Sequence, residues 1–92
     1  MAYAWKLSYN PHTSATGINM AATINRLAAV DLAGYFEGDV AKHNSFRDEV
    51  GGIPYQLDKD GCVKPSEIPG LGVEVNEDAI NAHPLIEGSC YV

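Results

Sequence analysis

Basic side chains, paired cysteines and long apolar runs are all scarce in this sequence. Six Lys and Arg residues, scattered singly, stand against twelve Asp and Glu. Such a chain lacks the positively charged surface that binds nucleic acid. No segment approaches the roughly 18 apolar residues of a membrane-crossing helix, and the first ten residues lack the features of a signal peptide. We therefore expect a cytoplasmic protein that binds neither nucleic acid nor a membrane.

The two cysteines, Cys62 and Cys90, are far apart and have no Cys-x-x-Cys spacing. Without an export signal we expect two reduced thiols rather than a disulfide. The remaining composition, 46% apolar and 20% charged, is typical of a globular protein. A chain of 92 residues forms at most one small domain with a modest core. We expect it to need neighbouring polypeptide to cover its apolar surface.

The first half of the chain has the pattern of an α/β unit. Residues 3–9 are apolar and aromatic, as in a buried strand, and Asn10-Pro11 ends that run. Residues 17–32 have helical periodicity, and residues 34–40 indicate a second short strand. A strand, a helix and a strand in about 35 residues predict a right-handed βαβ unit with parallel strands.

The second half has turn signals and one helix signal. The sequence Asp-Lys-Asp-Gly at 58–61 predicts a turn within a hairpin over residues 53–65. Asn76 is a good cap for a short helix over residues 77–82. For the first helix, Ser14 or Thr16 is the expected N-cap and Gly34 the expected end. We interpret "NSFRDEVGG" (44–52) as an irregular connection.

His12 and Glu37 are the candidate catalytic residues. Working side chains of α/β proteins lie at the carboxyl ends of parallel strands, where His12 follows the first expected strand and Glu37 ends the second. The two should be neighbours, and imidazole is suited to proton transfer near neutral pH. A protonated glutamate could donate a hydrogen bond to a developing oxyanion. A loop histidine is also commonly structural, and a glutamate at a strand end is commonly a solvated charge, so spacing alone leaves both interpretations open.

Other polar residues indicate no second site. His43 and His83 have no Cys or His at metal-ligand spacing. Residues 58–61 lack the later glutamate of a calcium loop, so we interpret them as a turn.

Two segments of the chain resemble a known family. They are "NPHTSATGINMAATINRLAAVDLAGYFEGDVAKHNSFRDEV" (10–50) and "PGLGVEVNEDAINAHPLIEG" (69–88). Together they are similar to the C-terminal end of the enolase superfamily, in its mandelate racemase and acid-sugar dehydratase branch. "PGLGVEV", "FRDE" and the histidine after a strand carry the resemblance.

The resemblance implies a fold and a chemistry. It implies an α/β fold in which residues 1–50 form the last βαβ unit of a (β/α) barrel, and residues 51–92 a hairpin and tail that complete a capping domain. His12 then corresponds to the general acid/base, and Glu37 to the acid that hydrogen-bonds the substrate carboxylate. The family removes the proton next to a carboxylate of an acid sugar or 2-hydroxy acid and uses Mg²⁺.

The same resemblance shows what this chain lacks. A barrel needs roughly 200 residues or more, and the family's three carboxylate metal ligands have no counterpart here. We therefore expect a C-terminal fragment that binds no cofactor alone and is inactive without the missing barrel and capping domain. The alternative is a small α+β binding or assembly module that buries its exposed edges by self-association. Metal-free catalysis by His12 and Glu37 is a third possibility.

Overall fold

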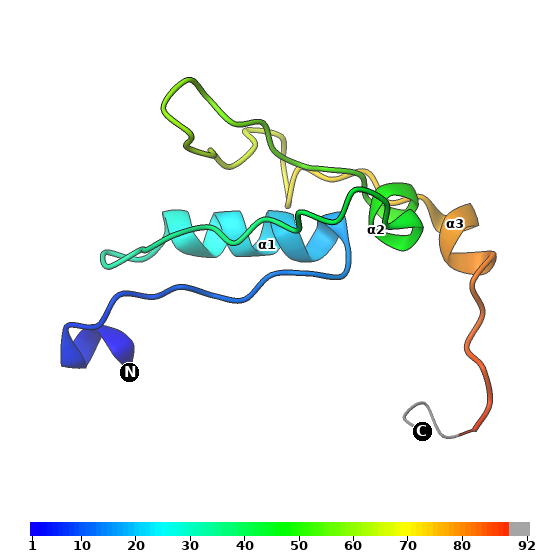
Figure 1. Cartoon of the computed structure of the whole chain (residues 1–92), viewed down its shortest axis with the longest axis horizontal. Helices are drawn as coiled ribbons and strands as arrows, with labels where there is room; N and C mark the ends of the chain where they lie inside the picture. Colours follow the sequence, from blue (N-terminus) through cyan, green and yellow to red (C-terminus); the bar gives the residue numbers. More distant parts are fainter. Residues whose placement is uncertain (89–92) are drawn as a thin grey trace.

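The computed structural model describes residues 1–88 and contains four helical elements. A short 3₁₀ helix, η1 (Ala2–Trp5), is followed by α1 (Gly17–Ala28), α2 (Ser45–Val50) and α3 (Glu77–Asn81). Figure 1 shows that extended runs before and after α1 follow the helix along its length. Helix α2 contacts both α1 and α3. No helix in the described part of the chain is long and apolar enough to cross a membrane.

The expected α/β fold is wrong, because residues 1–88 form no strand ladder and therefore neither a βαβ unit of a barrel nor a paired hairpin. Pairing between the two extended runs is parallel, but it consists of one bridge, between Tyr9 and Ala33. The Tyr9 N–H donates to the Leu32 carbonyl (2.9 Å), and the Gly34 N–H donates to the Tyr9 carbonyl (3.0 Å). Parallel strands are stable where both sheet faces and both edges are covered. This chain alone does not supply that cover, so the runs pair over a single residue each.

The beginning of the chain, expected to be extended, turns back on itself instead. The Ala4 N–H donates to the Met1 carbonyl (3.1 Å) in η1, and Lys6 ends the helix in the left-handed conformation with φ 55°. The Lys6 ammonium lies 5.3 Å from the centre of the Tyr3 ring. With no neighbouring strand to bond, these backbone groups bond locally.

Helix α1 confirms the helical periodicity and contains most of the core. Its apolar face is buried, whereas the helix ends at Ala28, earlier than expected, and is closed by Ala29 rather than Gly34. Thr16 is the N-cap, but its side chain makes no capping hydrogen bond. Gly17 lies so close to the Gly51 and Gly52 carbonyls that a Cβ there would collide with them. The buried apolar residues of the described chain are Met20, Ala21, Ile24, Leu27, Val50 and Ala79.

The two short helices begin at asparagine caps. The Asn76 side chain accepts from the Ala79 N–H (3.1 Å), which confirms the predicted cap of α3. The Asn44 side chain accepts from the Arg47 N–H (3.1 Å) at the start of α2. The interpretation of residues 44–52 as irregular was therefore wrong. The Asn44 cap begins the helix, and burial of Arg47 and Val50 stabilises it, because a helix of six residues is not stable by itself.

The predicted turn at 58–61 is present without the strand pairing of a hairpin. The Gly61 N–H donates to the Asp58 carbonyl (3.0 Å), and the Asp58 side chain accepts from the N–H groups of Asp60 (2.9 Å) and Cys62 (2.8 Å). These backbone donors, that of Cys62 first, lower the pKa of the Asp58 carboxyl. The turn is thus fixed by its own polar groups and needs no sheet.

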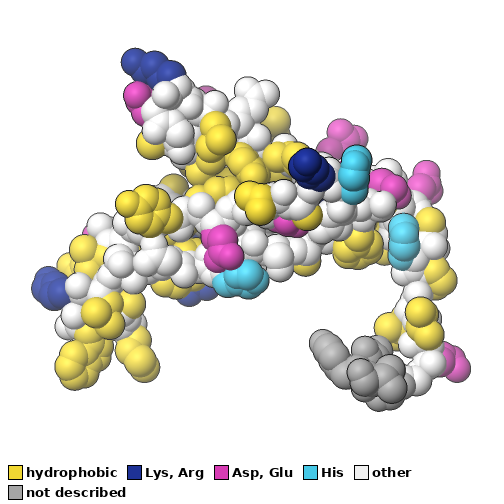
Figure 2. Space-filling view, viewed as in Figure 1, with side chains coloured by type: hydrophobic (Ala, Val, Ile, Leu, Met, Phe, Trp, Pro, Cys, Tyr) yellow, Lys and Arg dark blue, Asp and Glu magenta, His cyan; other side chains and the backbone are white. Residues whose placement is uncertain are grey.

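Much apolar surface stays exposed. Sixteen large hydrophobic side chains of the described chain are exposed, among them Trp5, Tyr35 and Val40. Figure 2 shows hydrophobic side chains spread over the visible face, with a group at the N-terminal end. The radius of gyration is 15.3 Å, against about 12 Å for a typical compact domain of this length. The chain is therefore more open than a self-sufficient domain.

Candidate functional site

The structure places His12 and Glu37 next to each other. His12 lies in the extended run before α1, Glu37 lies in the run after it, and the bridge between Tyr9 and Ala33 brings the two runs together. The His12 Nδ1 atom lies 3.0 Å from the Glu37 Oε1 atom. The side chains are 77% and 56% exposed, respectively. The pair is thus open to a small molecule from solution.

Asn10 and Gly34 fix the register of the two runs at this point. The Asn10 carboxamide oxygen accepts from the Tyr35 N–H (2.8 Å), and its nitrogen donates to the Ser8 hydroxyl (3.1 Å). Any Cβ at Gly34 would overlap the Asn10 side chain. The Asn10 side-chain amide therefore takes the place of a backbone acceptor from a neighbouring strand, two residues before Glu37.

The loop between His12 and α1 is tightly folded. Thr13 is buried, and its hydroxyl has no hydrogen-bond partner in the described part of the chain. Ala15 adopts a left-handed conformation with φ 76°, which is uncommon for a residue with a Cβ. The Asn19 side chain donates to the Ser14 carbonyl (2.8 Å). These features orient the loop so that Thr13 points inward while His12 is exposed.

The contact between the His12 imidazole and the Glu37 carboxylate determines which ring nitrogen carries the proton. When Glu37 is ionised it accepts only, so Nδ1 of His12 carries the proton and donates it to Oε1. The other ring nitrogen, Nε2, is then free to accept a proton. An exposed pair of this kind contributes little to folding stability. The main effect of the hydrogen bond is therefore to fix the tautomer and the orientation of the His12 ring.

A buried arginine holds the chain just after Glu37. Arg47, on α2, has a side chain that is 4% exposed, and its NH1 lies 3.3 Å from the Asp39 carboxylate. The same nitrogen donates to the backbone carbonyls of Asp39 (3.3 Å) and Ala41 (3.1 Å), and Nε donates to Asp48 (2.6 Å). Each charge of this cluster is thus paired.

The pKa values of the cluster are shifted by these contacts. The Ala41 N–H (2.9 Å) and then the Asn44 amide (3.1 Å) donate to Asp39 and lower the pKa of its carboxyl. The hydrogen bond between Arg47 and Asp48 lowers the pKa of Asp48 and raises that of Arg47. Sequence reasoning missed this cluster. The Asn44 cap three residues before Arg47 is the signal that could have placed the arginine on a helix beside Asp39.

An aromatic pair holds the chain on either side of Glu37. The Phe36 and Tyr55 rings meet edge to face, with centroids 5.0 Å apart. The Tyr55 hydroxyl also lies over Gly38, where a Cβ would come within 2.8 Å of it. Residues 53–55 were expected to belong to a hairpin, so this contact was not foreseen.

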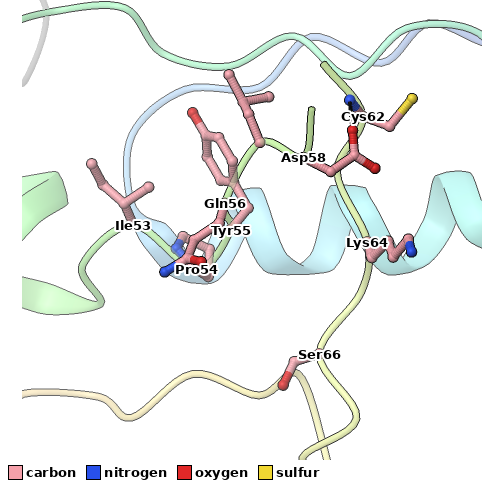
Figure 3. Close-up of a pocket in the computed structure, with 9 residues that line it drawn as sticks. Ile53, Pro54, Tyr55, Gln56, Asp58, Cys62, Lys64 and Ser66 are labelled. Atoms are coloured by element: carbon pink, nitrogen blue, oxygen red, sulfur yellow. Dashed lines mark hydrogen bonds between the residues drawn. The ribbon is translucent and has the colours of Figure 1, made fainter. Parts of the chain in front are cut away.

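The segment that carries Tyr55 also forms an open hollow of about 490 Å³. Its lining residues come from the two extended runs on either side of the turn, 53–58 and 62–66, as Figure 3 shows. His12 and Glu37 are not among them, so the hollow is separate from the candidate pair.

The remaining polar candidates form no site in residues 1–88. No group of three His, Cys, Asp or Glu that could hold a metal ion occurs in this part of the chain. His83 Nδ1 lies 2.8 Å from the Ala79 carbonyl, and its ring packs edge to face on Phe46. Cys62 is a free, exposed thiol, whereas Cys90 lies outside the described residues. Mg²⁺ is bound through several oxygen ligands. Since residues 1–88 bring no three such side chains together, they do not fit this ion.

Comparison with known proteins gives the family. A sequence model described as "Enolase C-terminal domain-like" matches residues 1–79. The chain belongs to this family. The prediction of the enolase superfamily is thereby confirmed, while the branch within the superfamily stays a prediction.

A solved structure of the enolase superfamily agrees with this assignment. It is a member of the superfamily from Polaromonas sp. JS666, 49% identical to this chain, with a TM-score of 0.82. The match covers 100% of this chain and 24% of that protein. The chain thus spans about a quarter of the length of its superfamily neighbour. The comparison with curated proteins finds no match.

Proposed function

We propose that this chain supplies the proton-transferring pair of an enolase-superfamily enzyme of the mandelate racemase and acid-sugar dehydratase branch. The reaction is removal of the proton next to the carboxylate of an acid sugar or 2-hydroxy acid. The observation that carries the proposal is the 3.0 Å contact between His12 and Glu37 on an exposed surface. It leaves His12 Nε2 available as the base.

In this proposal each residue has a stated part. His12 Nε2 takes the proton from the substrate carbon, and in a dehydration His12 also protonates the departing hydroxyl. Glu37 accepts from His12 Nδ1 and stabilises the imidazolium that forms. The family resemblance implies a different part for Glu37. As a protonated acid it would donate a hydrogen bond to the substrate carboxylate, and in that state it would no longer be the ionised acceptor of the His12 Nδ1 proton.

The rest of the reaction depends on groups outside this chain. The family's Mg²⁺ would neutralise the charge of the deprotonated substrate, but the donors of residues 1–88 do not fit the ion. The chain also has a net charge of −6, which disfavours an anionic intermediate. We therefore propose that the isolated chain is inactive and works with the remaining three quarters of such an enzyme.

A chimera tests this function. In the Polaromonas superfamily member, the matching quarter is replaced by this chain, and exchange of the α-proton in D₂O is followed by NMR on substrates that the unmodified protein turns over. We expect exchange that falls at least a hundredfold in the His12→Asn chimera. Exchange that is unaffected by His12→Asn would disprove the role of His12.

The exposed apolar surface supports a second candidate, a module that self-associates without catalysis. Sixteen large hydrophobic side chains of the described chain are exposed, and burial of such surface drives association. Sedimentation of the isolated chain distinguishes the two. A stable, defined oligomer with a melting transition would favour the module, and a poorly folded monomer would favour the enzyme fragment.

A further inference from the structure

The position of Glu37 is fixed by few backbone contacts. Its run pairs with the run of His12 only at the bridge between Tyr9 and Ala33, and the Asn10 amide adds one bond at Tyr35. Within the described chain, no ladder continues to Glu37 itself. Side chains from the second half of the molecule must therefore hold this carboxylate against His12.

The first such contact comes from Tyr55. Its ring packs against Phe36, the residue before Glu37, with 76° between the ring planes. Its hydroxyl reaches over Gly38, the residue after Glu37. One side chain thus touches both neighbours of the carboxylate residue. A Cβ at position 38 would come within 2.8 Å of the hydroxyl, so the Tyr55 side chain would have to shift to admit it.

The second contact comes from Arg47. Its guanidinium binds the carboxylate and carbonyl of Asp39 and the carbonyl of Ala41, two to four residues beyond Glu37. The guanidinium is almost fully buried, and a buried, multiply bonded arginine is held far more firmly than an exposed one. Because Arg47 sits on α2, which contacts α1, it ties the run of Glu37 to the helical core.

We propose that Tyr55 and Arg47 are positioning residues that hold Glu37 in contact with His12. The inference rests on the proposed function for its catalytic meaning, but the contact itself can be measured without substrate. Neither residue touches His12 or Glu37 through a hydrogen bond given by the structure. Tyr55 acts through the residues on both sides of Glu37, and Arg47 acts through the backbone that follows it.

The test uses the intact 92-residue chain and the imidazole ¹⁵N spectrum of His12. When Nδ1 donates to Glu37, His12 carries its proton on Nδ1, and loss of the contact moves the proton toward Nε2, the tautomer preferred in free histidine. We expect Gly38→Ala, which drives a Cβ into the Tyr55 hydroxyl, to reduce the Nδ1-protonated population at least threefold.

A rescue variant separates positioning from general damage. In Gly38→Ala with Tyr55→Phe the oxygen is absent, and the nearest ring carbon, Cζ, lies 3.6 Å from the new Cβ, an ordinary contact. We expect this double variant to recover the wild-type tautomer. Tyr35→Phe is the matched control, because the Tyr35 side chain is 87% exposed, and it should change nothing.

Arg47 is tested with two variants. Arg47→Met removes the bonds to Asp39 and Ala41 and should reduce the Nδ1-protonated population as Gly38→Ala does. Arg47→Lys keeps the charge and should retain part of it. If Arg47→Met loses its helical circular dichroism, the tautomer of His12 in Arg47→Lys decides whether Arg47 positions Glu37. Full retention of the wild-type tautomer in Arg47→Lys would then overturn the role of Arg47.

The outcomes distinguish this inference from the proposed function. A tautomer that responds to Glu37→Leu but to none of the Gly38, Tyr55 or Arg47 variants would overturn the positioning role. A chimera whose proton exchange ignores His12→Asn, beside a tautomer that follows these variants, would overturn the function and leave the positioning intact.

Discussion

Helix α1 and its surroundings differ sharply from the segment that follows α2. In the first region, an amphipathic helix buries its apolar face, and Gly17 packs directly on the Gly51–Gly52 backbone. In the second, over residues 53–75, the turn at 58–61 is well bonded, yet Ile53, Leu57 and Ile68 are exposed. Local hydrogen bonds thus suffice to form a turn. Burial of the apolar extended runs would need a sheet, and residues 1–88 form none.

The largest expected effect is in the core of the first region. Met20 is 1% exposed, and its replacement by alanine leaves a cavity. We expect Met20→Ala to lower the free energy of unfolding by about 2–5 kcal/mol, measured by urea titration. Ile68→Ala is the control from the second region, where the side chain is exposed, and should change it by less than about 0.5 kcal/mol. Equal losses of unfolding free energy in the two variants would show that the two regions do not differ in how they contribute to stability.

The acidic cluster predicts how stability depends on pH. The folded-state pKa values of Asp39 and Asp48 are lowered, so the unfolded state binds more protons in acid. Their contribution is present above the ordinary aspartate pKa of about 3.9 and is lost as the pH falls through the lower folded values. The hydrogen bond from Arg47 is the first cause of the lowered pKa of Asp48, whereas for Asp39 the Ala41 and Asn44 donors come first. Thermal melts should thus show a smaller acid-induced loss of stability in Arg47→Met than in the wild type, mainly through Asp48. An unchanged acid limb would contradict the pairing.

A smaller effect is expected at the cap of α3. Asn76→Ala removes the side chain that accepts from the Ala79 N–H. Loss of an N-cap costs about 1 kcal/mol, measurable by urea titration. Asn81→Ala, in the same helix but without a capping role, is the matched control. A larger loss of unfolding free energy in Asn81→Ala than in Asn76→Ala would show that the Asn76 cap does not stabilise α3.

The smallest effect on stability is expected at the candidate site. His12 and Glu37 are exposed, so His12→Gln should change the free energy of unfolding by less than about 0.5 kcal/mol. The same urea titrations provide the measurement. A large loss would mean that the pair is a structural contact rather than a site.

The sequence predicted the features that depend on neighbours in the chain. The apolar face of α1, the Asn76 cap and the turn at 58–61 each arise within a few residues, and each is confirmed. The bounds of α1 were less accurate because its last turn has no strong stop signal before Gly34. The predicted strands were wrong because the two runs pair at a single bridge, and a parallel pair becomes a sheet only where its faces and edges are covered.

The candidate site was predicted in part. The sequence placed His12 and Glu37 together through the expected parallel pairing, and one parallel bridge suffices to bring their side chains within 3.0 Å. The catalytic roles stay a prediction. The roles of Arg47 and Tyr55 were not foreseen, because their contacts with residues 36–41 join positions 6 to 19 apart and follow no sequence pattern of their own.

The tautomer of His12 tests the central claim most directly. In the wild-type chain at neutral pH, the imidazole ¹⁵N spectrum should show the proton on Nδ1, and Glu37→Leu, which removes the acceptor oxygen, should move it toward Nε2. The same tautomer population in both proteins would show that Glu37 does not hold His12, and would contradict the proposed pair.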